Sequence, residues 1–206
     1  MLLPFTYPWI IKKHFSDNKK ILDVGCGDGT FMAKINFDKK YEVTGIDLFD
    51  PYLKKAGKTK AYEKVLKMDV RKLNLKDSSF DCVHASQVLE HLKEKEALSL
   101  IKKMEKIAES KVIIGAPNGH FHQDAYDKND LQRHQSSWQI EDFQKLGYTC
   151  YGQALKFIYG ENGLVHNKLA AIGLVRFFLF GLSYLLSPLA YIFPSLGAHI
   201  IAVKEI

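Results

Sequence analysis

The sequence predicts a single α/β domain over residues 1–206, built on a Rossmann-like, mostly parallel sheet of seven strands with helices on both faces. An apolar run at Ile21–Val24 leads directly into a glycine-rich loop and then into a helical pattern. Short apolar segments alternate with amphipathic ones, and two of them end in an acid, Asp47 and Asp69. The 206 residues, 47% hydrophobic and 25% charged, are enough for one ordinary core.

The order of the elements follows from these periodicities and from the turn residues between them. We expect helices at Tyr7–Phe15 (within an N-terminal segment 1–18), Asp28–Ile35, from about Asp50, at Lys93–Glu109 and at Ile140–Gly147, and strands at Lys20–Val24, Tyr41–Asp47, Glu63–Val70, Ser79–Ser86, Lys111–Gly119, Thr149–Tyr159 and Ala198–Ile206.

The loop DVGCGDG (residues 23–29) has glycines at alternate positions, which favour a sharp turn and a close approach of the backbone to a ligand. Thr30 follows the third glycine, so the loop lacks the G-x-G-x-x-G spacing of a dinucleotide site. Asp23 and Asp28 place carboxylates where a pyrophosphate would lie. The loop therefore favours a ligand that carries positive charge, such as an amine and a sulfonium.

Asp47 lies about eighteen residues beyond the last loop glycine, close to the spacing of a ribose-binding carboxylate in a βαβ unit. The alternative is a residue that caps the helix beginning near Asp50. Because the glycine loop precedes Asp47 at the spacing of a βαβ unit, we favour the ligand role for Asp47. Leu48 is then an apolar contact for an adenine ring.

From Lys20 to Gly119 the chain resembles class I S-adenosylmethionine (SAM) dependent methyltransferases. The loop 23–29 is similar to their first motif, and residues 80–91, with Phe80-Asp81 and Ser86-Gln-Val-Leu-Glu-His91, are similar to the segment with a V-L-E-H sequence in small-molecule methyltransferases. The resemblance implies SAM as cofactor, S-adenosylhomocysteine as product, and a last strand antiparallel beside the sixth. The implied cofactor residues are Asp23, Gly25, Cys26, Gly27, Asp28, Gly29, Asp47, Leu48, Asp69, Val70, Ser86 and Gln87.

Within the resemblance, the Asp69 carboxylate accepts a hydrogen bond from the adenine amino group, and the backbone amide of Val70 meets the ring. A turn acid that caps residues 71–73 is the alternative for Asp69. Ser86 and Gln87 follow a strand end and are expected to face the methionine part. Glu90-His91 either caps the next helix or forms the cleft wall, and both alternatives stay open.

The irregular stretch Asn118–Trp138 is long for a loop in a compact domain, and we interpret it as a lid over the acceptor. His134 and His122 are the candidates for a base that would activate a hydroxyl acceptor. His120, His122 and Asp124 could be metal ligands, but no further ligand residues follow at the spacing that a metal site requires. We therefore expect no metal.

An apolar helical insertion at 163–195 precedes the last strand, and residues 169–193 contain no acid and only Arg176 as a charge. A single crossing of a bilayer would separate the last strand from its sheet, so a span conflicts with the fold. Three interpretations stay open: a membrane-surface or lipid-binding element, a buried cap or apolar acceptor pocket, and a homodimer face. Lys168 and Arg176 suit an anionic surface.

Three scattered cysteines without a CxxC pair fit a reducing compartment, and the N-terminal segment lacks the pattern of a signal peptide. We therefore expect a cytoplasmic protein, peripheral to the membrane if the insertion binds lipid. The net charge of +6 is dispersed and forms no stripe suited to nucleic acid. The resemblance implies methyl transfer to a small-molecule, sugar-linked or lipid-linked acceptor. A SAM-binding protein without catalysis and an NAD-type oxidoreductase are the rival functions.

Overall fold

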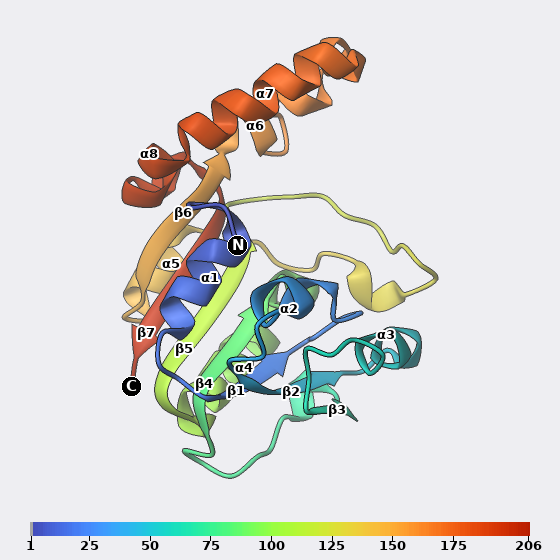
Figure 1. Cartoon of the computed structure of the whole chain (residues 1–206), viewed down its shortest axis with the longest axis vertical. Helices are drawn as coiled ribbons and strands as arrows, with labels where there is room; N and C mark the ends of the chain where they lie inside the picture. The colour runs from blue at the N-terminus through green and yellow to red at the C-terminus, as the bar shows by residue number, and fades with distance from the viewer. Residues whose placement is uncertain (1) are drawn as a thin grey trace.

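A seven-stranded sheet in the order β3-β2-β1-β4-β5-β7-β6 forms the centre of the computed structural model, which describes residues 2–206 (Figure 1). β7 is antiparallel to both of its neighbours, and all other neighbouring strands are parallel. The prediction of a mostly parallel sheet with one antiparallel strand is confirmed. The strands are β1 (Lys20–Val24), β2 (Glu42–Asp47), β3 (Lys64–Lys67), β4 (Phe80–Ser86), β5 (Ala108–Pro117), β6 (Thr149–Leu155) and β7 (Gly197–Glu205).

Helices cover both faces of this sheet. On one face, Ile21 of β1 packs with residues of α1 and α2, and on the other Leu22 packs with residues of α4 and α5. Alternate residues of one strand thus enter two different cores, which explains why the parallel strands are nearly continuous apolar runs. The helices of the domain are α1 (Tyr7–Phe15), α2 (Thr30–Ile35), α3 (Asp50–Ala56), α4 (Glu94–Ile107) and α5 (Ile140–Lys145), with 3₁₀ turns η1 (Val70–Lys72), η2 (Leu89–His91) and η3 (Asp130–Gln132).

Several boundaries differ from the sequence-based expectation. The third strand ends at Lys67 because Asp69 begins the turn η1. The fifth strand begins at Ala108, three residues early, and the helix before it stops at Ile107. The sixth strand ends at Leu155, where the short helix α6 (Lys156–Tyr159) replaces its expected final residues.

The insertion before β7 forms an arm, which we define as α7 (Gly173–Leu185) and α8 (Ser187–Ile192). It is flanked by the 3₁₀ turns η4 (Leu164–His166), η5 (Lys168–Ala171) and η6 (Pro194–Leu196). The two helices meet at Leu186, two residues before Pro188, whereas Gly181 lies inside α7 and does not interrupt it.

The two helices of the arm differ in how they contact the domain. α8 packs on β6, where a Cβ at Gly152 would lie 2.4 Å from the carbonyl oxygen of Ala190. α7 projects away from the sheet (Figure 1), with Phe177, Phe178 and Leu185 each at least 67% exposed. The arm as a whole is therefore not the buried cap that was one of the interpretations. Among residues 2–206, no helix has both the length and the apolar character needed to cross a membrane.

Candidate active site

A cavity of about 760 Å³ lies beyond the carboxyl ends of β1, β2 and β4, and the lid, α1 and α3 form its other walls. Open parallel sheets bind ligands at this edge, and the volume is typical of a small-molecule site. The structure brings most of the predicted residues together on its lining: Asp23, Gly25, Cys26, Gly27, Asp28, Asp47, Leu48, Asp69, Val70, Ser86, Gln87 and His134.

Two predicted residues lie apart from this lining. Gly29 is the N-cap of α2, and a Cβ there would lie 2.9 Å from the Cα of Ala56, so this glycine serves helix packing. The His122 ring is 72% exposed, and its Nε2 lies 3.4 Å from Asp124. The geometry of the cavity therefore favours His134 over His122 as a residue that meets the acceptor.

The glycine loop adopts the left-handed backbone that its sequence predicts. Gly25, Gly27 and Gly29 have φ angles of 69°, 55° and 79°. A Cβ at Gly25 would lie 2.5 Å from the Val88 side chain, whereas one at Gly27 would meet no atom within 4 Å. Gly27 lines the cavity, so its missing side chain leaves room there for a ligand to approach the backbone.

Asp47 connects the end of β2 to the glycine loop. Its Oδ2 accepts the Gly27 amide at 2.9 Å and its Oδ1 accepts the Phe49 amide at 2.9 Å. Phe49 is the N-cap of α3, and no side chain caps that helix, so the alternative of a capping aspartate is not observed. Each carboxylate oxygen can accept two hydrogen bonds, which leaves Asp47 free to accept ribose hydroxyls.

Asp69 has the turn-capping role that was the alternative for it, and its position on the cavity keeps the adenine contact as a prediction. It lines the cavity, and it also begins η1 by accepting the Arg71 amide at 3.0 Å. The Arg71 guanidinium binds both oxygens of Asp69, at 2.9 and 2.8 Å. These hydrogen bonds lower the pKa of the Asp69 carboxyl and occupy part of its capacity to accept from a ligand.

Asp23 is buried beneath the glycine loop with both of its oxygens engaged. Its Oδ1 lies 2.7 Å from Nδ1 of His84, the residue paired with it across β1 and β4, and its Oδ2 accepts the Tyr62 hydroxyl at 2.7 Å. Burial and the Asp23 charge raise the pKa of Tyr62. Asp23 therefore contributes to the cavity chiefly by fixing the strand end from which the loop departs.

Tyr7 of α1 is a lining residue that the sequence analysis did not identify. Its hydroxyl lies 2.8 Å from Ser86 Oγ and accepts a longer bond, 3.4 Å, from Gln87 Nε2. Burial raises the pKa of Tyr7 to about 12, so it is a neutral phenol at neutral pH. Gln87 has a φ of 55°, a conformation that costs energy in a residue with a Cβ. The signal available for Tyr7 was the apolar and aromatic composition of the helix expected at Tyr7–Phe15, which requires burial against the sheet.

The lid, residues 118–138, is attached to the domain at both sides of the cavity. On one side the Tyr52 hydroxyl of α3 donates to Asp127 at 2.9 Å. On the other side, the Gln135 amide donates to the Glu90 carbonyl at 2.7 Å, and Ser136 Oγ donates to the Leu89 carbonyl at 3.0 Å. These bonds place the returning part of the lid directly against η2.

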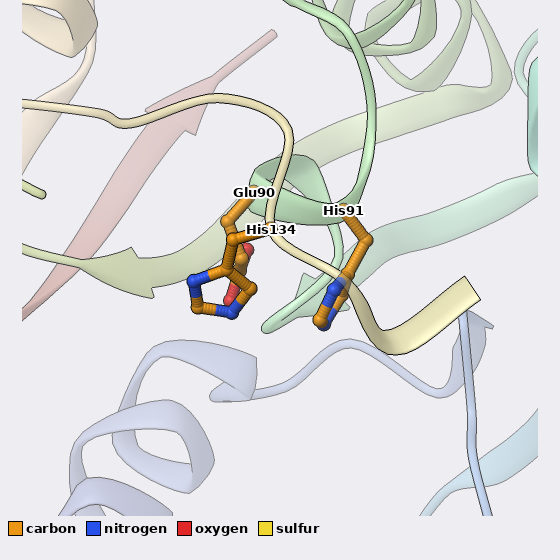
Figure 2. Close-up of side chains that lie close together, drawn as sticks. All are labelled: Glu90, His91 and His134. Carbon is orange, nitrogen blue, oxygen red and sulfur yellow. The ribbon is translucent and has the colours of Figure 1, made fainter. Parts of the chain in front are cut away.

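Glu90, His91 and His134 meet at this junction, and one ligand atom from each lies within 4.8 Å of the others (Figure 2). Glu90 is 2% exposed, and neither carboxylate oxygen has a hydrogen-bond partner. Burial raises the pKa of Glu90 to about 8 and lowers that of His91 to about 4. The capping alternative for this pair is not observed, because Lys93 is the N-cap of α4 and its backbone amide donates to the Glu96 carboxylate at 3.1 Å. All three residues line the cavity.

Comparison with known proteins supports the resemblance. Residues 22–113 match the family model of the methyltransferase domain. A segment of 105 residues is 32% identical to an uncharacterized methyltransferase of Schizosaccharomyces pombe, and the match covers 44% of this chain and 37% of that protein. The chain thus spans well under half of the length of this relative.

Solved structures show the same fold. The methyltransferase domain of the bacterial protein CtHen1-CN has a TM-score of 0.60 at 17% identity, with 97% of each chain covered. A SAM-dependent methyltransferase from Archaeoglobus fulgidus has a TM-score of 0.59 at 15% identity, with 97% of this chain and 94% of that chain covered. The predicted architecture is confirmed at the level of the fold, and residues 22–113 are similar to a methyltransferase domain.

Proposed function

We propose that this chain, in which residues 22–113 match a methyltransferase domain, transfers a methyl group from SAM to a small-molecule acceptor and releases S-adenosylhomocysteine. The observation that carries the proposal is the cavity itself. It places a glycine loop, two strand-end carboxylates and a polar lid around one space of about 760 Å³.

The residues on the lining fit SAM. Asp47 would accept the ribose hydroxyls, Leu48 and Val70 would contact the adenine ring, and Asp28 would lie near the positively charged end. Bound there, SAM supplies an electrophilic methyl carbon: the acceptor's lone pair forms the new bond to it while the carbon–sulfur bond breaks and sulfur keeps the electron pair. Ser86 and Gln87, with the Tyr7 hydroxyl on them, are positioned at the strand end where the methionine part is expected.

The acceptor would enter beneath the lid, and His134 is the residue that we propose to activate it. His134 Nδ1 lies 2.6 Å from the Phe121 carbonyl, which only accepts, so Nδ1 carries the hydrogen and Nε2 carries the lone pair. A hydroxyl acceptor loses its proton as the new bond forms, and positioning supplies most of the remaining rate.

Binding and turnover are tested separately. Calorimetric titration with SAM is expected to show one site, and methyl-labelled SAM incubated with a cell extract is expected to label an acceptor, which is then partitioned between organic solvent and water. Label in the organic phase identifies a lipid-linked acceptor, and label in water identifies a soluble or sugar-linked one. Tight binding without any transfer would favour a SAM-binding protein, and NADH binding in place of SAM would favour an oxidoreductase.

For the arm, the proposed partner is an anionic membrane surface. Phe177, Phe178 and Leu185 expose apolar area, and the chain has no acid from residue 162 to residue 204 while it carries Lys168 and Arg176 there. The 13 residues of α7 extend about 20 Å, so the helix is suited to lying in the interface. A lipid-linked acceptor would then be met at that surface.

Sedimentation with vesicles tests this partner. Phe177→Ser with Phe178→Ser is expected to abolish binding to phosphatidylserine vesicles, whereas the matched change Phe37→Ser, at an exposed phenylalanine outside the arm, leaves it unchanged. If the unchanged protein, the double variant and Phe37→Ser all fail to bind anionic vesicles, the membrane proposal is refuted. If analytical ultracentrifugation instead showed a dimer that the double substitution dissociates, the arm would be a face between two copies.

A further inference from the structure

We propose that Glu90, His91 and His134 bind a divalent transition-metal cation at the acceptor end of the cavity. The three side chains come from two segments, η2 and the returning part of the lid, and they point toward the same space (Figure 2). The inference rests on the proposed function, because it assigns how the acceptor of the methyl group is held and activated.

Glu90 is the first argument. It is 2% exposed, and among residues 2–206 neither of its oxygens has a hydrogen-bond partner or a basic residue paired with it. A buried carboxylate without a partner is costly, and proteins keep such groups where the charge meets a cation. Both oxygens of Glu90 are available to a ligand in the cavity.

The two histidines present unshared lone pairs to the same place. Because His134 Nδ1 donates to the Phe121 carbonyl at 2.6 Å, its Nε2 is free to bind a metal. Metal-binding histidines usually donate the other ring nitrogen to a carbonyl or carboxylate in this way, which fixes the orientation of the ring. His91 Nδ1 is buried and has no partner.

Backbone hydrogen bonds hold the two segments at a fixed separation. The Gln135 amide and the Ser136 amide both donate to the Glu90 carbonyl, at 2.7 and 3.2 Å, and Gln135 Nε2 donates to the His91 carbonyl at 2.6 Å. His134 is thus placed beside Glu90 by its neighbours in the chain. Metal bonds of about 2.1 Å need ligand atoms roughly 3–3.5 Å apart, so the side chains move slightly inward on binding.

The chemistry of the set selects the cation. Two imidazoles and one carboxylate are typical of Mn²⁺, Fe²⁺ and Zn²⁺ sites, whereas Mg²⁺ and Ca²⁺ prefer oxygen ligands alone. Three protein ligands leave coordination positions open toward the cavity. An acceptor hydroxyl bound there would have a lowered pKa, so His134, with its Nε2 on the cation, would activate the acceptor through the metal and not as the base itself.

Metal binding by the chelator-treated protein, without SAM or acceptor, is the test. Mn²⁺ followed by electron paramagnetic resonance and Co²⁺ followed by visible absorption are expected to show one equivalent bound. Glu90→Gln and His134→Asn should each weaken binding by at least about tenfold. His122→Asn is the matched control, a lid histidine beside an acid on the exposed surface, and should bind as the unchanged protein does.

Absence of saturable binding by about 1 mM of either ion would overturn the inference, as would an equal loss in His122→Asn. SAM titration of the same samples checks that the variants fold and separates the two proposals. If SAM binds and the cations do not, the cation site fails while the proposed function stands. If the cations bind and SAM does not, the proposed function fails.

Discussion

Asp23 and Glu90 are both buried carboxylates on the lining of the same cavity, yet their surroundings differ completely. Asp23 has both oxygens engaged, by His84 and by Tyr62. Glu90 has both oxygens without a partner, beside two histidines that also present free lone pairs. The difference teaches that burial of an acid does not by itself indicate a ligand site. What separates a structural carboxylate from a candidate ligand is whether the protein already satisfies it.

The two clusters also form by different means. The partner of Asp23 arrives by sheet pairing, because His84 is its neighbour across β1 and β4. The cluster around Glu90 is complete only when the lid brings His134 back to η2, more than forty residues later in the chain. A cluster assembled by the lid can change with the lid, whereas the one in the sheet cannot change without disturbing the strands.

The largest effect is expected from matched amide substitutions in the two clusters. Asp23→Asn removes the charge from a fully engaged buried group and should lower the free energy of unfolding by about 2–4 kcal/mol. Glu90 has no partner and, with its pKa raised to about 8, is largely protonated at neutral pH, so Glu90→Gln should change the free energy of unfolding by less than about 1 kcal/mol. Urea denaturation of both variants checks the contrast, and equal losses would contradict it.

Asp47 is intermediate between Asp23 and Glu90. It accepts hydrogen bonds from two backbone amides, and its oxygens can still accept further hydrogen bonds from a ligand. Asp47→Ala should weaken SAM binding by about 10- to 100-fold while the protein stays folded. Asp50→Ala, an exposed acid nearby on α3, is the control and should leave the affinity unchanged. Calorimetry with SAM provides the measurement, and unchanged affinity in Asp47→Ala would count against the ribose-binding assignment.

Histidines on the same cavity extend the comparison to pH. His199 of β7 has no partner on Nδ1, and burial lowers its pKa from 6.5 to about 4. A depressed pKa means that the unfolded chain binds the proton more readily, so His199 favours folding above about pH 6.5 and this contribution is lost as pH falls toward 4. Between pH 7 and pH 5, the free energy of unfolding of the unchanged protein should therefore fall by about 1–2 kcal/mol more than that of His199→Gln, which has no imidazole to protonate. Parallel curves for the two proteins would refute this.

The sequence predicts the glycine-loop edge of the cavity well because its signals are local. The strand, the alternate glycines and the following helix lie within sixteen residues, and the positive φ angles at Gly25 and Gly27 follow from turn chemistry alone. The length of one βαβ unit predicts the position of Asp47 at the end of the second strand. Each of these residues lines the cavity as expected.

What the sequence does not disclose depends on contacts between distant segments. Whether Glu90 finds a partner is decided by where the lid packs, and Tyr7 reaches Ser86 only once α1 lies over the sheet. The apolar composition of the arm shows that its side chains favour burial away from water. It does not show that much of the apolar surface of α7 stays exposed, because that depends on how the arm packs against the domain.

The position of β7 has a consequence for the order in which the chain folds. β7 lies between β5 and β6, although about forty residues of arm and turns precede it in the sequence. Until β7 is synthesised, β5 and β6 therefore each have an edge without its native partner, and the apolar helix α7 has already left the ribosome. Unpaired edges and exposed apolar helices are both routes to aggregation. Arrival of Gly197–Glu205 closes both edges in one step, so the yield of folded protein in the cell depends on how quickly this strand inserts.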